Sequence, residues 1–401
     1  MNRAPRKTRI LMLLENAGIP EDHRVVREAE ALLGIGCDVT IICPTCGRQP
    51  WSEVVRGIQV YRFPQSFSPR GFLGYVWEYG YSIAMFFLLA SYVWCRQGFD
   101  VIHVHTPPDL TATVAIFFQQ FGKKFVFDHH DLSPELYLAR RDSVTPNLVY
   151  RVLRYFERLA CRQASRLIAT NTTQRNVQIQ RCGAKPEHCY VVRNGPNEAF
   201  LKEVKPWPEL RFPGKIVLGY VGIIGVQDGV DYMIRVVQEL KYQHRRDDFL
   251  AVIVGHGPAL ADLKVLARTL RVEQQVLFTG RVAFADVPRY IAAFDICLTP
   301  DPSNAYNDSC TTIKTLEYMA LGKPTVCFRT AENEITAGEA ALYADHNNVS
   351  AYANLVVRLM DNPGLRADMG ALARRRIDAG LTWERQAVQL VELYRDLLRL
   401  C

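Results

Sequence analysis

A lysine and a glutamate follow a polar loop in an arrangement that suits phosphate and sugar binding. The segment Asp295–Val326 has the pattern of a strand, a polar loop, a helix and a second strand, and the loop ends in the N-cap residues Asn307–Ser309. The N-terminus of such a helix presents free N–H groups and a partial positive charge, which together bind phosphate. Lys314 lies in the predicted first turn, where a cation opposes the helix dipole, so a bound anion would explain its presence. Glu317 lies on the same face, within reach of sugar or ribose hydroxyls, although the two side chains could equally form a surface ion pair.

Histidine and aspartate residues in two short runs raise the question of a metal site. They are His103, His105, Asp128, His129, His130 and Asp131. His103 and His105 share one face of a strand, because side chains alternate along it. His129 and His130 are adjacent and point apart, and no further ligand stands at the spacing of a metal site. We therefore expect no metal and no other cofactor.

Two other motifs exclude particular chemistries. Gly222, Gly225 and Gly229 follow a predicted strand, but their spacing is not G-x-G-x-x-G, which argues against a dinucleotide dehydrogenase. Cys43 and Cys46 form a CxxC pair without a second pair for zinc, and no helix is predicted to begin at the first cysteine, as a thioredoxin motif requires. We interpret these two cysteines as ordinary thiols.

The elements that must position these residues alternate between strands and helices. Many of the predicted strands are apolar runs without polar alternation, as expected where both faces of a sheet are covered. They are Arg9–Leu14, Asp38–Cys43, Ile58–Phe63, Asp100–His105, Lys124–Asp128, Arg166–Thr170, Tyr190–Arg193, Lys215–Val221, Phe249–Val254, Gln275–Thr279, Asp295–Leu298 and Pro324–Phe328. Amphipathic segments such as Glu21–Leu33, Val230–Leu240 and Pro258–Leu270 lie between them, and this alternation predicts parallel sheets with right-handed crossovers.

The alternation restarts near residue 215, after a segment with three prolines at 204–214 that indicates a linker. We therefore predict an α/β fold of two doubly wound parallel-sheet domains, at residues 1–205 and 206–382. In such sheets ligands bind outside the carboxyl ends of the strands, so functional residues are expected just after each strand.

Composition and net charge limit the classes of protein and of ligand that fit this chain. The chain has 401 residues, a length that suits two domains. Its 48 Lys and Arg against 41 Asp and Glu give a net charge of +7, which is too diffuse for a nucleic-acid-binding protein but suits an anionic small molecule or membrane surface. The basic N-terminus runs directly into a predicted strand without a signal peptide, and the 11 cysteines are an odd number. We therefore expect a cytoplasmic protein with reduced thiols.

Two segments bear on contact with the inner face of a membrane. Gly71–Cys95 is strongly apolar, but Glu78 interrupts it and a predicted strand follows at once, which disfavours a spanning helix of about 20 apolar residues. The segment is either a helix packed in the domain or one that lies on the membrane surface. Further on, four arginines recur at helical spacing: Arg151, Arg154, Arg158 and Arg162. They form either a face for anionic lipid headgroups or an ordinary solvated face.

The helix that carries Lys314 and Glu317 also carries a family resemblance. The sequence Glu317-Tyr-Met-Ala-Leu-Gly-Lys-Pro-Thr-Val326 resembles the donor-site helix of retaining glycosyltransferases of family 4, which have the GT-B fold of two facing Rossmann-like domains. Other segments resemble family elements in the matching order across nearly the whole chain: Asp22–Val25 with Glu28-Ala29, Phe127–Leu132, Val192–Pro196, Gly219–Gly222, Val254–Pro258 and Phe278–Val282. The resemblance implies that the last helix, within residues 383–401, crosses back onto the N-terminal domain.

The resemblance also implies roles for individual residues. Glu317, Lys314 and His130 would be the catalytic residues, with His130 hydrogen-bonded to a donor hydroxyl and oriented by Asp131. The donor-binding residues would be Gly222, Gly225, Gly255, His256, Gly257, Arg281, Val282, Asp308, Ser309, Thr311 and Thr312. The residues on the acceptor and diphosphate side would be Asp22, Arg24, Asp131 and Asn194. The glycines would let the backbone approach the ligand closely, and the backbone at Arg281 and Val282 would read the nucleobase.

The chain departs from the family pattern at two places. The family has two glutamates with seven residues between them, and the first would fall at Ser309, so either Asp308 substitutes for it or Ser309 and the helix amides meet the sugar directly. Gln227 and Asp228 occupy the positions of the basic residues that hold the diphosphate. The cations expected instead are Lys314 and Arg24.

The resemblance predicts a metal-independent, retaining glycosyltransferase. It would move a sugar from a nucleotide diphosphate sugar, a UDP-sugar, to a glycan or polyprenyl-linked acceptor in polysaccharide assembly. The helix dipole and basic side chains would stabilise the departing diphosphate in place of Mg²⁺. Two alternatives remain open: a nucleotide-sugar epimerase, which would consume the donor without an acceptor, and a non-catalytic member that binds a partner or scaffolds a complex.

Overall fold

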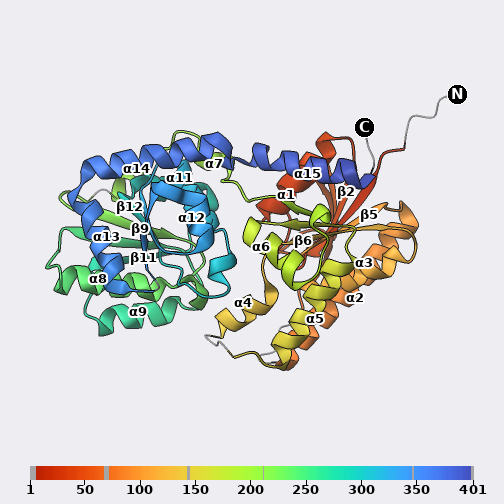
Figure 1. Cartoon of the computed structure of the whole chain (residues 1–401), viewed down its shortest axis with the longest axis horizontal. Coiled ribbons are helices and arrows are strands. Elements are labelled where there is room, and N and C mark those ends of the chain that lie inside the picture. Colours follow the sequence, from red (N-terminus) through yellow and green to blue (C-terminus); the bar gives the residue numbers. More distant parts are fainter. Residues whose placement is uncertain (1–5, 67–71, 142–144, 211, 346, 399–401) are drawn as a thin grey trace. The chain divides into compact units, whose positions relative to one another are not determined.

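The chain folds into two α/β units, each built on one sheet (Figure 1). The computed structural model describes residues 6–66, 72–141, 145–210, 212–345 and 347–398. The first unit comprises Met1–Tyr137, Thr145–Arg193 and Gln386–Cys401, and the second comprises Leu138–Val144 and Asn194–Arg385. The change of unit at Arg193 precedes the proline-containing segment where we expected the boundary. The predicted fold class, two doubly wound α/β sheets, is confirmed.

The first sheet has eight strands in the order β3-β4-β2-β1-β5-β6-β7-β8. All neighbours are parallel except β3 and β4, which form an antiparallel hairpin. The strands are β1 (Arg9–Leu13), β2 (Asp38–Pro44), β3 (Ser52–Val55), β4 (Ile58–Phe63), β5 (Val101–His105), β6 (Lys124–His129), β7 (Arg166–Ala169) and β8 (Cys189–Val191). Because the chain order reverses between β1 and β5, the carboxyl ends of these two strands mark the switch point where ligands bind in such sheets.

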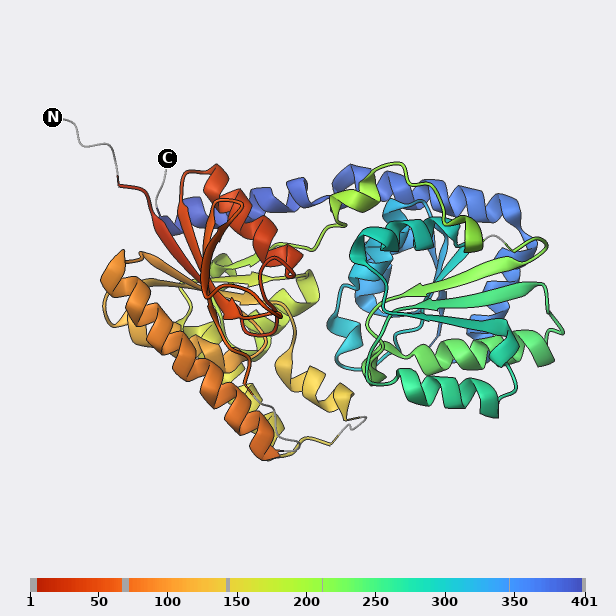
Figure 2. The same ribbon diagram turned by 180° about the vertical axis from the view of Figure 1, so that it is seen from behind.

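Helices cover both faces of the first sheet. Leu11, Val104 and Phe127 face a core formed with α2 (Phe72–Arg96), α3 (Ala112–Gln119) and α5 (Leu148–Gln163). Figure 2 shows α2 running along the outside of this face. The opposite face carries α1 (His23–Gly34) and α15 (Trp383–Leu398). The unit also contains the short helix α6 (Thr172–Asn176) and the first residues of α4 (Ser133–Arg140), up to Tyr137.

The last helix, α15, is tied to the first sheet by polar contacts. The hydroxyl of Tyr394 lies 2.9 Å from Nδ1 of His103 in β5. Asp396 accepts hydrogen bonds from Arg166 at 2.7 Å and from the Tyr190 hydroxyl at 2.9 Å. The residues of α15 from Gln386 onward therefore belong to the first unit, the one to which we expected this helix to return.

The long apolar helix α2 packs on the sheet through Phe86, Ala90 and Val93, which are all buried. Its Trp77 and Leu88 are exposed. Among the residues that the structure describes, no helix combines the length and apolar character needed to cross a membrane.

The second sheet has six parallel strands in the order β11-β10-β9-β12-β13-β14. They are β9 (Ile216–Val221), β10 (Phe249–Val254), β11 (Val276–Gly280), β12 (Ile296–Thr299), β13 (Thr325–Phe328) and β14 (Ala341–Ala344). One face packs on α8 (Val230–Tyr242), α9 (Leu260–Thr269) and α13 (Val349–Asp361). The other packs on α10 (Val287–Ala293), α11 (Ile313–Ala320), α12 (Ala331–Ala337) and α14 (Pro363–Arg376), with the short α7 (Glu198–Leu201) against the same core. The switch point of this sheet lies at the carboxyl ends of β9 and β12.

Candidate functional site

At the switch point of the second sheet, Lys314 meets two carboxylates and a phenol. Its Nζ lies 2.8 and 3.0 Å from the two carboxylate oxygens of Asp301, in the loop after β12. The same nitrogen lies 3.5 Å from Asp228, in the loop after β9, and 3.4 Å from the hydroxyl of Tyr220. Three segments that are far apart in the sequence thus converge on one cation.

The charges of this cluster explain why a lysine is stable in the first turn of α11. Burial alone would lower the pKa of Lys314, but Asp301, with Tyr220 and Asp228, raises it above its ordinary value. Burial raises the pKa of Asp228, and Lys314 opposes that rise. The anion that we expected to account for Lys314 is therefore supplied by the protein itself.

The residues before α11 differ from the prediction. Asn307–Ser309 forms a separate 3₁₀ turn and does not cap the helix, which begins at Ile313 after Thr312. The Ser309 hydroxyl donates to the carbonyl oxygen of Tyr306 at 2.7 Å. The predicted N-cap at Asn307–Ser309 is wrong because these residues form a separate turn that ends at Cys310, and the residue before the helix is Thr312.

The remaining residues of this loop have partners within the second unit. Asp308 accepts a hydrogen bond from Ser303 at 3.2 Å. Thr311 donates to the buried Glu332 at 3.2 Å. Thr312 contacts the Thr315 hydroxyl at 2.8 Å and makes no side-chain cap, so its hydroxyl does not take up the first N–H groups of α11. Glu317 lies one turn beyond Lys314 and is half-buried.

The predicted glycines bring loop backbones together. Gly255 has a φ of +146°, and a Cβ at this position would collide with the carbonyl oxygen of Gly222. A Cβ on Gly257 would lie 2.7 Å from the backbone nitrogen of Ile224. Gly225 donates its N–H to Asp228 at 3.0 Å. The glycines therefore let the loops after β9 and β10 pack backbone against backbone at the carboxyl edge.

Three other predicted donor residues flank these loops. His256 is exposed, and its carbonyl oxygen accepts a hydrogen bond from the Ile224 N–H at 3.1 Å. Arg281 is exposed just after β11, whereas Val282 is half-buried and packs against the apolar core. All three residues lie at the carboxyl edge of the second sheet, as expected. No contact among the described residues indicates which nucleobase they would bind.

In the first unit, a second polar cluster forms around Asp128 at the end of β6. The register of β5 and β6 places His105 opposite Asp128, with 3.3 Å between Nδ1 and the carboxylate. His103 and His105 share one face, as predicted, and their rings stack at 4.2 Å. His130 follows β6, and its Nε2 lies 2.9 Å from Asp128.

Helix α1 supplies the countercharge to this cluster. Arg24 contacts Asp128 at 3.3 Å and Glu28 at 2.9 Å, and it donates to the carbonyl oxygen of Val192 at 3.0 Å. Burial opposes the ionisation of Asp128, but the Arg24 guanidinium holds the pKa of that carboxyl well below its usual range. Burial and the neighbouring Asp128 raise the pKa of Glu28 well above its usual range. Arg24 therefore stabilises the ionised form of Asp128, whereas burial beside that charge favours the protonated form of Glu28.

The same cluster contains the residue types of a metal site. Glu28, His103, His105 and Asp128 are fully buried, and each offers a ligand atom within 4.8 Å of the others. The expectation that no further ligand lies near the two strand histidines is wrong, because α1 and β6 each bring a carboxylate to them. The Arg24 guanidinium already contacts both carboxylates and supplies the positive charge that a cation would provide.

The other residues predicted for the acceptor side lie at the start of α1, after β6 and at the start of the second unit. The Asp22 carboxylate caps α1 by accepting the Val25 N–H at 3.0 Å. Asp131 follows His130 and is half-buried, and Asn194 begins the second unit. His129 points to the opposite face of the sheet, where its Nε2 lies 3.8 Å from Glu157 of α5.

Sequence reasoning assigned no role to two acidic residues of the first unit. Glu28 is one turn after Arg24 on α1, a spacing that signals a possible pair. Glu15 follows β1 at the carboxyl edge and accepts a hydrogen bond from Ser82 at 3.0 Å. Burial raises the pKa of Glu15 to about 7. Its position directly after a strand at the switch point was the signal that could have found it.

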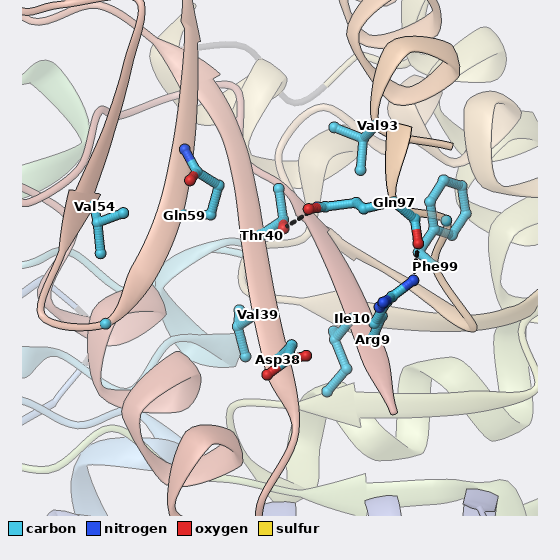
Figure 3. A pocket seen from close by; sticks show the side chains of 12 residues that line it. Arg9, Ile10, Asp38, Val39, Thr40, Val54, Gln59, Val93, Gln97 and Phe99 are labelled. Carbon is cyan, nitrogen blue, oxygen red and sulfur yellow. Dashed lines mark hydrogen bonds between the residues drawn. The ribbon is translucent and has the colours of Figure 1, made fainter. Parts of the chain in front are cut away.

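A cavity of about 310 Å³ lies at the amino edge of the first sheet (Figure 3). It is lined by the starts of β1 and β2, including Arg9, Ile10 and Asp38, and by the end of α2. Gln97 donates to the Thr40 hydroxyl at 2.8 Å across it. The candidate site residues follow the carboxyl ends of the strands, so this cavity is not part of the site.

Comparison with known proteins identifies the family. Residues 23–200 match the family described as Glycosyltransferase Family 4, and residues 215–362 match Glycosyl transferases group 1. The D-inositol 3-phosphate glycosyltransferase of Acidothermus cellulolyticus is 27% identical over 318 residues, which are 75% of this chain and 68% of the relative. The 2-deoxystreptamine glucosyltransferase of Streptomyces kanamyceticus is 25% identical over 279 residues, which are 67% of this chain and 70% of the relative.

Solved structures agree on the fold over nearly the whole chain. Sucrose-phosphate synthase from Thermosynechococcus elongatus has a TM-score of 0.78 at 18% identity, covering 98% of this chain and 100% of that one. Anabaena HepE, solved in complex with UDP and glucose, has a TM-score of 0.73 at 17% identity, covering 97% of this chain and 100% of that one. The two family matches together span most of the chain, and the predicted family is confirmed. The chain belongs to glycosyltransferase family 4 and is a glycosyltransferase with the GT-B fold.

Proposed function

We propose that this glycosyltransferase moves a sugar from a UDP-sugar to a glycan or lipid-linked acceptor, with retention of configuration and without a metal ion. The observation that carries the proposal is Lys314 at the switch point of the second sheet, in the first turn of α11. A buried cation beside helix N–H groups suits a diphosphate. The choice of UDP as the nucleotide of the sugar donor is supported by HepE, a structural neighbour solved with UDP and glucose.

In the proposed donor complex, the diphosphate competes with Asp301 for Lys314. The N–H groups of the first turn of α11 supply further hydrogen bonds, because the Thr312 hydroxyl does not cap them. Glu317 accepts a hydrogen bond from a sugar or ribose hydroxyl, and His130 contacts a substrate hydroxyl. These roles use fixed dipoles and side-chain charges to stabilise the leaving group where another enzyme would use Mg²⁺.

The proposed reaction replaces one bond at the anomeric carbon with another on the same face. The bond from this carbon to the phosphate oxygen breaks, and a bond to the acceptor oxygen forms. The proton of the acceptor hydroxyl passes to the departing phosphate oxygen. No protein general base is required, because the leaving group accepts the proton.

A lipid-linked acceptor is supported by one surface of the first unit. Phe117 and Phe121 at the end of α3 are exposed, with Trp77 and Leu88 of the neighbouring α2. Arg151, Arg158 and Tyr155 of α5 are also exposed. Exposed aromatic and arginine side chains are the residue types that suit the surface of an anionic bilayer. Flotation with anionic vesicles tests this: Trp77→Ala/Leu88→Ala should reduce binding, whereas Val388→Ala on the exposed side of α15 should not.

A thermal-shift panel with UDP, GDP, ADP and NAD in excess EDTA tests the donor site. Ligand at about 100 times its dissociation constant stabilises the native state by roughly 2.7 kcal/mol, a readily measured shift. We expect UDP to raise the melting temperature in EDTA. A shift with GDP alone would contradict the assigned base, and a shift that EDTA abolishes would contradict metal independence.

A non-catalytic member of the family is the second candidate, and the cluster at Lys314 is the observation that favours it. Asp301 and Asp228 neutralise the cation that the diphosphate needs, and Ser309 stands where the family has a glutamate. Absence of a shift with every nucleotide would favour this reading. Consumption of UDP-sugar without an acceptor, with inversion at a ring carbon, would indicate an epimerase.

A further inference from the structure

Threonine hydroxyls hold the segment that leads into α11. The Thr311 hydroxyl donates to Oε2 of Glu332 at 3.2 Å. The Thr312 hydroxyl lies 2.8 Å from that of Thr315, which lies 3.3 Å from the hydroxyl of Thr299 at the end of β12. Because a hydroxyl has one proton and Thr311 gives it to Glu332, this side chain has none left for a phosphate oxygen, which only accepts. The predicted contact of Thr311 with the donor therefore does not use its hydroxyl proton.

The partner of Thr311 extends from a fixed backbone. Glu332 lies in the first turn of α12, and its side chain is fully buried. Thr330 caps this helix by accepting the Asn333 N–H at 3.2 Å, and the Asn333 side-chain amide donates to the carbonyl oxygen of Phe328 at 3.1 Å. Phe328 is the last residue of β13, so the start of α12 is tied to the sheet. The carboxyl group of Glu332 is therefore anchored independently of any ligand.

The hydrogen bond between Thr311 and Glu332 joins two neighbouring parts of the carboxyl edge. It links the segment after β12 to the helix after β13, and these two strands pair in parallel. Hydrogen bonds to a carboxylate are stronger than those between neutral groups, and burial removes the water that would compete for them. Since Glu332 has no exposed surface, it acts on this segment through Thr311 and not by touching a ligand.

We infer that Glu332 is a positioning residue of the donor site, which fixes the segment before α11 through Thr311 and so aims the first N–H groups of that helix at the diphosphate. The inference deepens the proposed function and rests on it for the identity of the ligand. A helix N-terminus binds phosphate because several N–H groups point at one anion. A segment that is free to shift would spread these directions and weaken the binding.

Hydrogen exchange of the unliganded protein tests the hold on this segment first. Thr311→Val removes the hydroxyl and keeps the branched shape of the side chain. We expect the backbone amides of residues 310–315 to exchange faster in this variant than in the parent protein. Thr325→Val is the matched control, because it removes a buried hydroxyl at the start of β13, at the opposite edge of the sheet. Equal exchange of residues 310–315 in Thr311→Val and the parent would overturn the inference.

Titration calorimetry with UDP then tests the consequence for the donor. Thr311→Val should raise the dissociation constant by about tenfold, the effect expected for the loss of one hydrogen bond to a charged group. Glu332→Leu should have the same effect, and the double variant should bind no more weakly than either single variant, because all three lack the same contact. Glu332→Gln keeps an acceptor for Thr311 and should bind UDP nearly as tightly as the parent. Losses that add in the double variant would overturn the inference.

The control variant separates positioning from stability. Thr325→Val should lower the melting temperature without changing the dissociation constant for UDP. A Thr311→Val variant that is only less stable, with the UDP affinity of the parent, would overturn the inference. If Glu332→Leu fails to fold, Thr311→Val and Glu332→Gln still decide, because the first lacks the contact and the second keeps it. A parent protein that does not bind UDP would count against the proposed function, while the exchange of residues 310–315 would still test the positioning.

Discussion

Nζ of Lys314 lies 2.8 Å from Oδ1 of Asp301, and this ion pair joins the first turn of α11 to the end of β12. Asp301 is 5% exposed, so a carboxylate left alone there would have neither water nor a cation beside it. Lys314 thus makes a structural contact with Asp301 and is also a candidate contact of the ligand. Variants of the two residues can separate these effects.

Removal of Lys314 should destabilise the protein as well as weaken donor binding. Breaking a buried ion pair from one side typically costs about 3–5 kcal/mol. Lys314→Met should therefore lower the melting temperature and abolish the UDP shift, whereas Lys314→Met/Asp301→Asn should recover stability but not binding. UDP affinity that survives in the double variant would exclude Lys314 from the donor site.

Asp301→Asn should increase the affinity for nucleotide diphosphates. The amide keeps the shape of the side chain but no longer neutralises Lys314, so the cation is available to the diphosphate. Titration calorimetry with UDP should show tighter binding, by about tenfold for each 1.4 kcal/mol gained. Weaker binding would mean that Asp301 positions Lys314 for the ligand and does not compete with it.

Glu317→Gln should spare the fold and reduce turnover. The side chain is half-buried in the second turn of α11, and the amide matches its size but is a weaker acceptor for a hydroxyl. We expect kcat/KM to fall by roughly tenfold or more, corresponding to about 1.4 kcal/mol of transition-state stabilisation. Glu273→Gln, at an exposed position after α9, is the matched control. Full activity of Glu317→Gln would remove this residue from the site.

Gly257→Ala should destabilise the second unit. The new methyl group would meet the backbone of Ile224, which cannot move aside as a flexible side chain can. Overpacking of this kind costs about 1–3 kcal/mol. Gly364→Ala in α14 is the control, because a Cβ there meets no atom within 4 Å. Equal unfolding free energies for the two variants, measured in denaturant, would contradict the close approach of the loops.

Glu15 should make the stability of the protein depend on pH. Burial raises its pKa to about 7 from an ordinary value of 4.5, so the folded state holds a proton that the unfolded state releases. The stabilisation is complete below about pH 4.5 and is lost as the pH rises through 7, by about 3 kcal/mol in all. Glu15→Gln, which is always neutral, should be more stable than the parent at pH 8 and equally stable at pH 4. If the difference in unfolding free energy between the two proteins did not change with pH, this result would contradict the raised pKa.

Twelve of the fourteen described strands follow the apolar runs in the sequence, and the two that were missed are both edge strands. β3 is short and half-exposed, since it pairs on one side only, so it lacks the continuous apolar run of a covered strand. Its signal was the turn Arg56-Gly57, where both residues have a positive φ and connect β3 to β4 as a hairpin. Two of the four residues of β14 are alanine, which favours strands weakly.

The sequence predicts contacts between site residues that share one segment. It does not predict contacts between residues of different segments. Lys314 and Glu317 share a helix, so their proximity follows from helical spacing alone. The contact of Lys314 with Asp228 depends on the order of β9 and β12 in the sheet, which no local pattern encodes. Glu28 meets His105 only because α1 packs across β5, so the sequence alone could not place this carboxylate beside the strand histidines.

The packing of α15 gives the chain an unusual order of assembly during synthesis. The first unit contains residues that leave the ribosome before the second unit, yet Tyr394 and Asp396, which complete its polar contacts, leave after it. Domains generally fold as they emerge, N-terminal first. Here the whole second unit is translated before the first can close, so the nascent first sheet has one face only partly covered until α15 has emerged. A ribosome that stalls near residue 380 would therefore hold an incomplete N-terminal unit beside a C-terminal unit that is nearly whole.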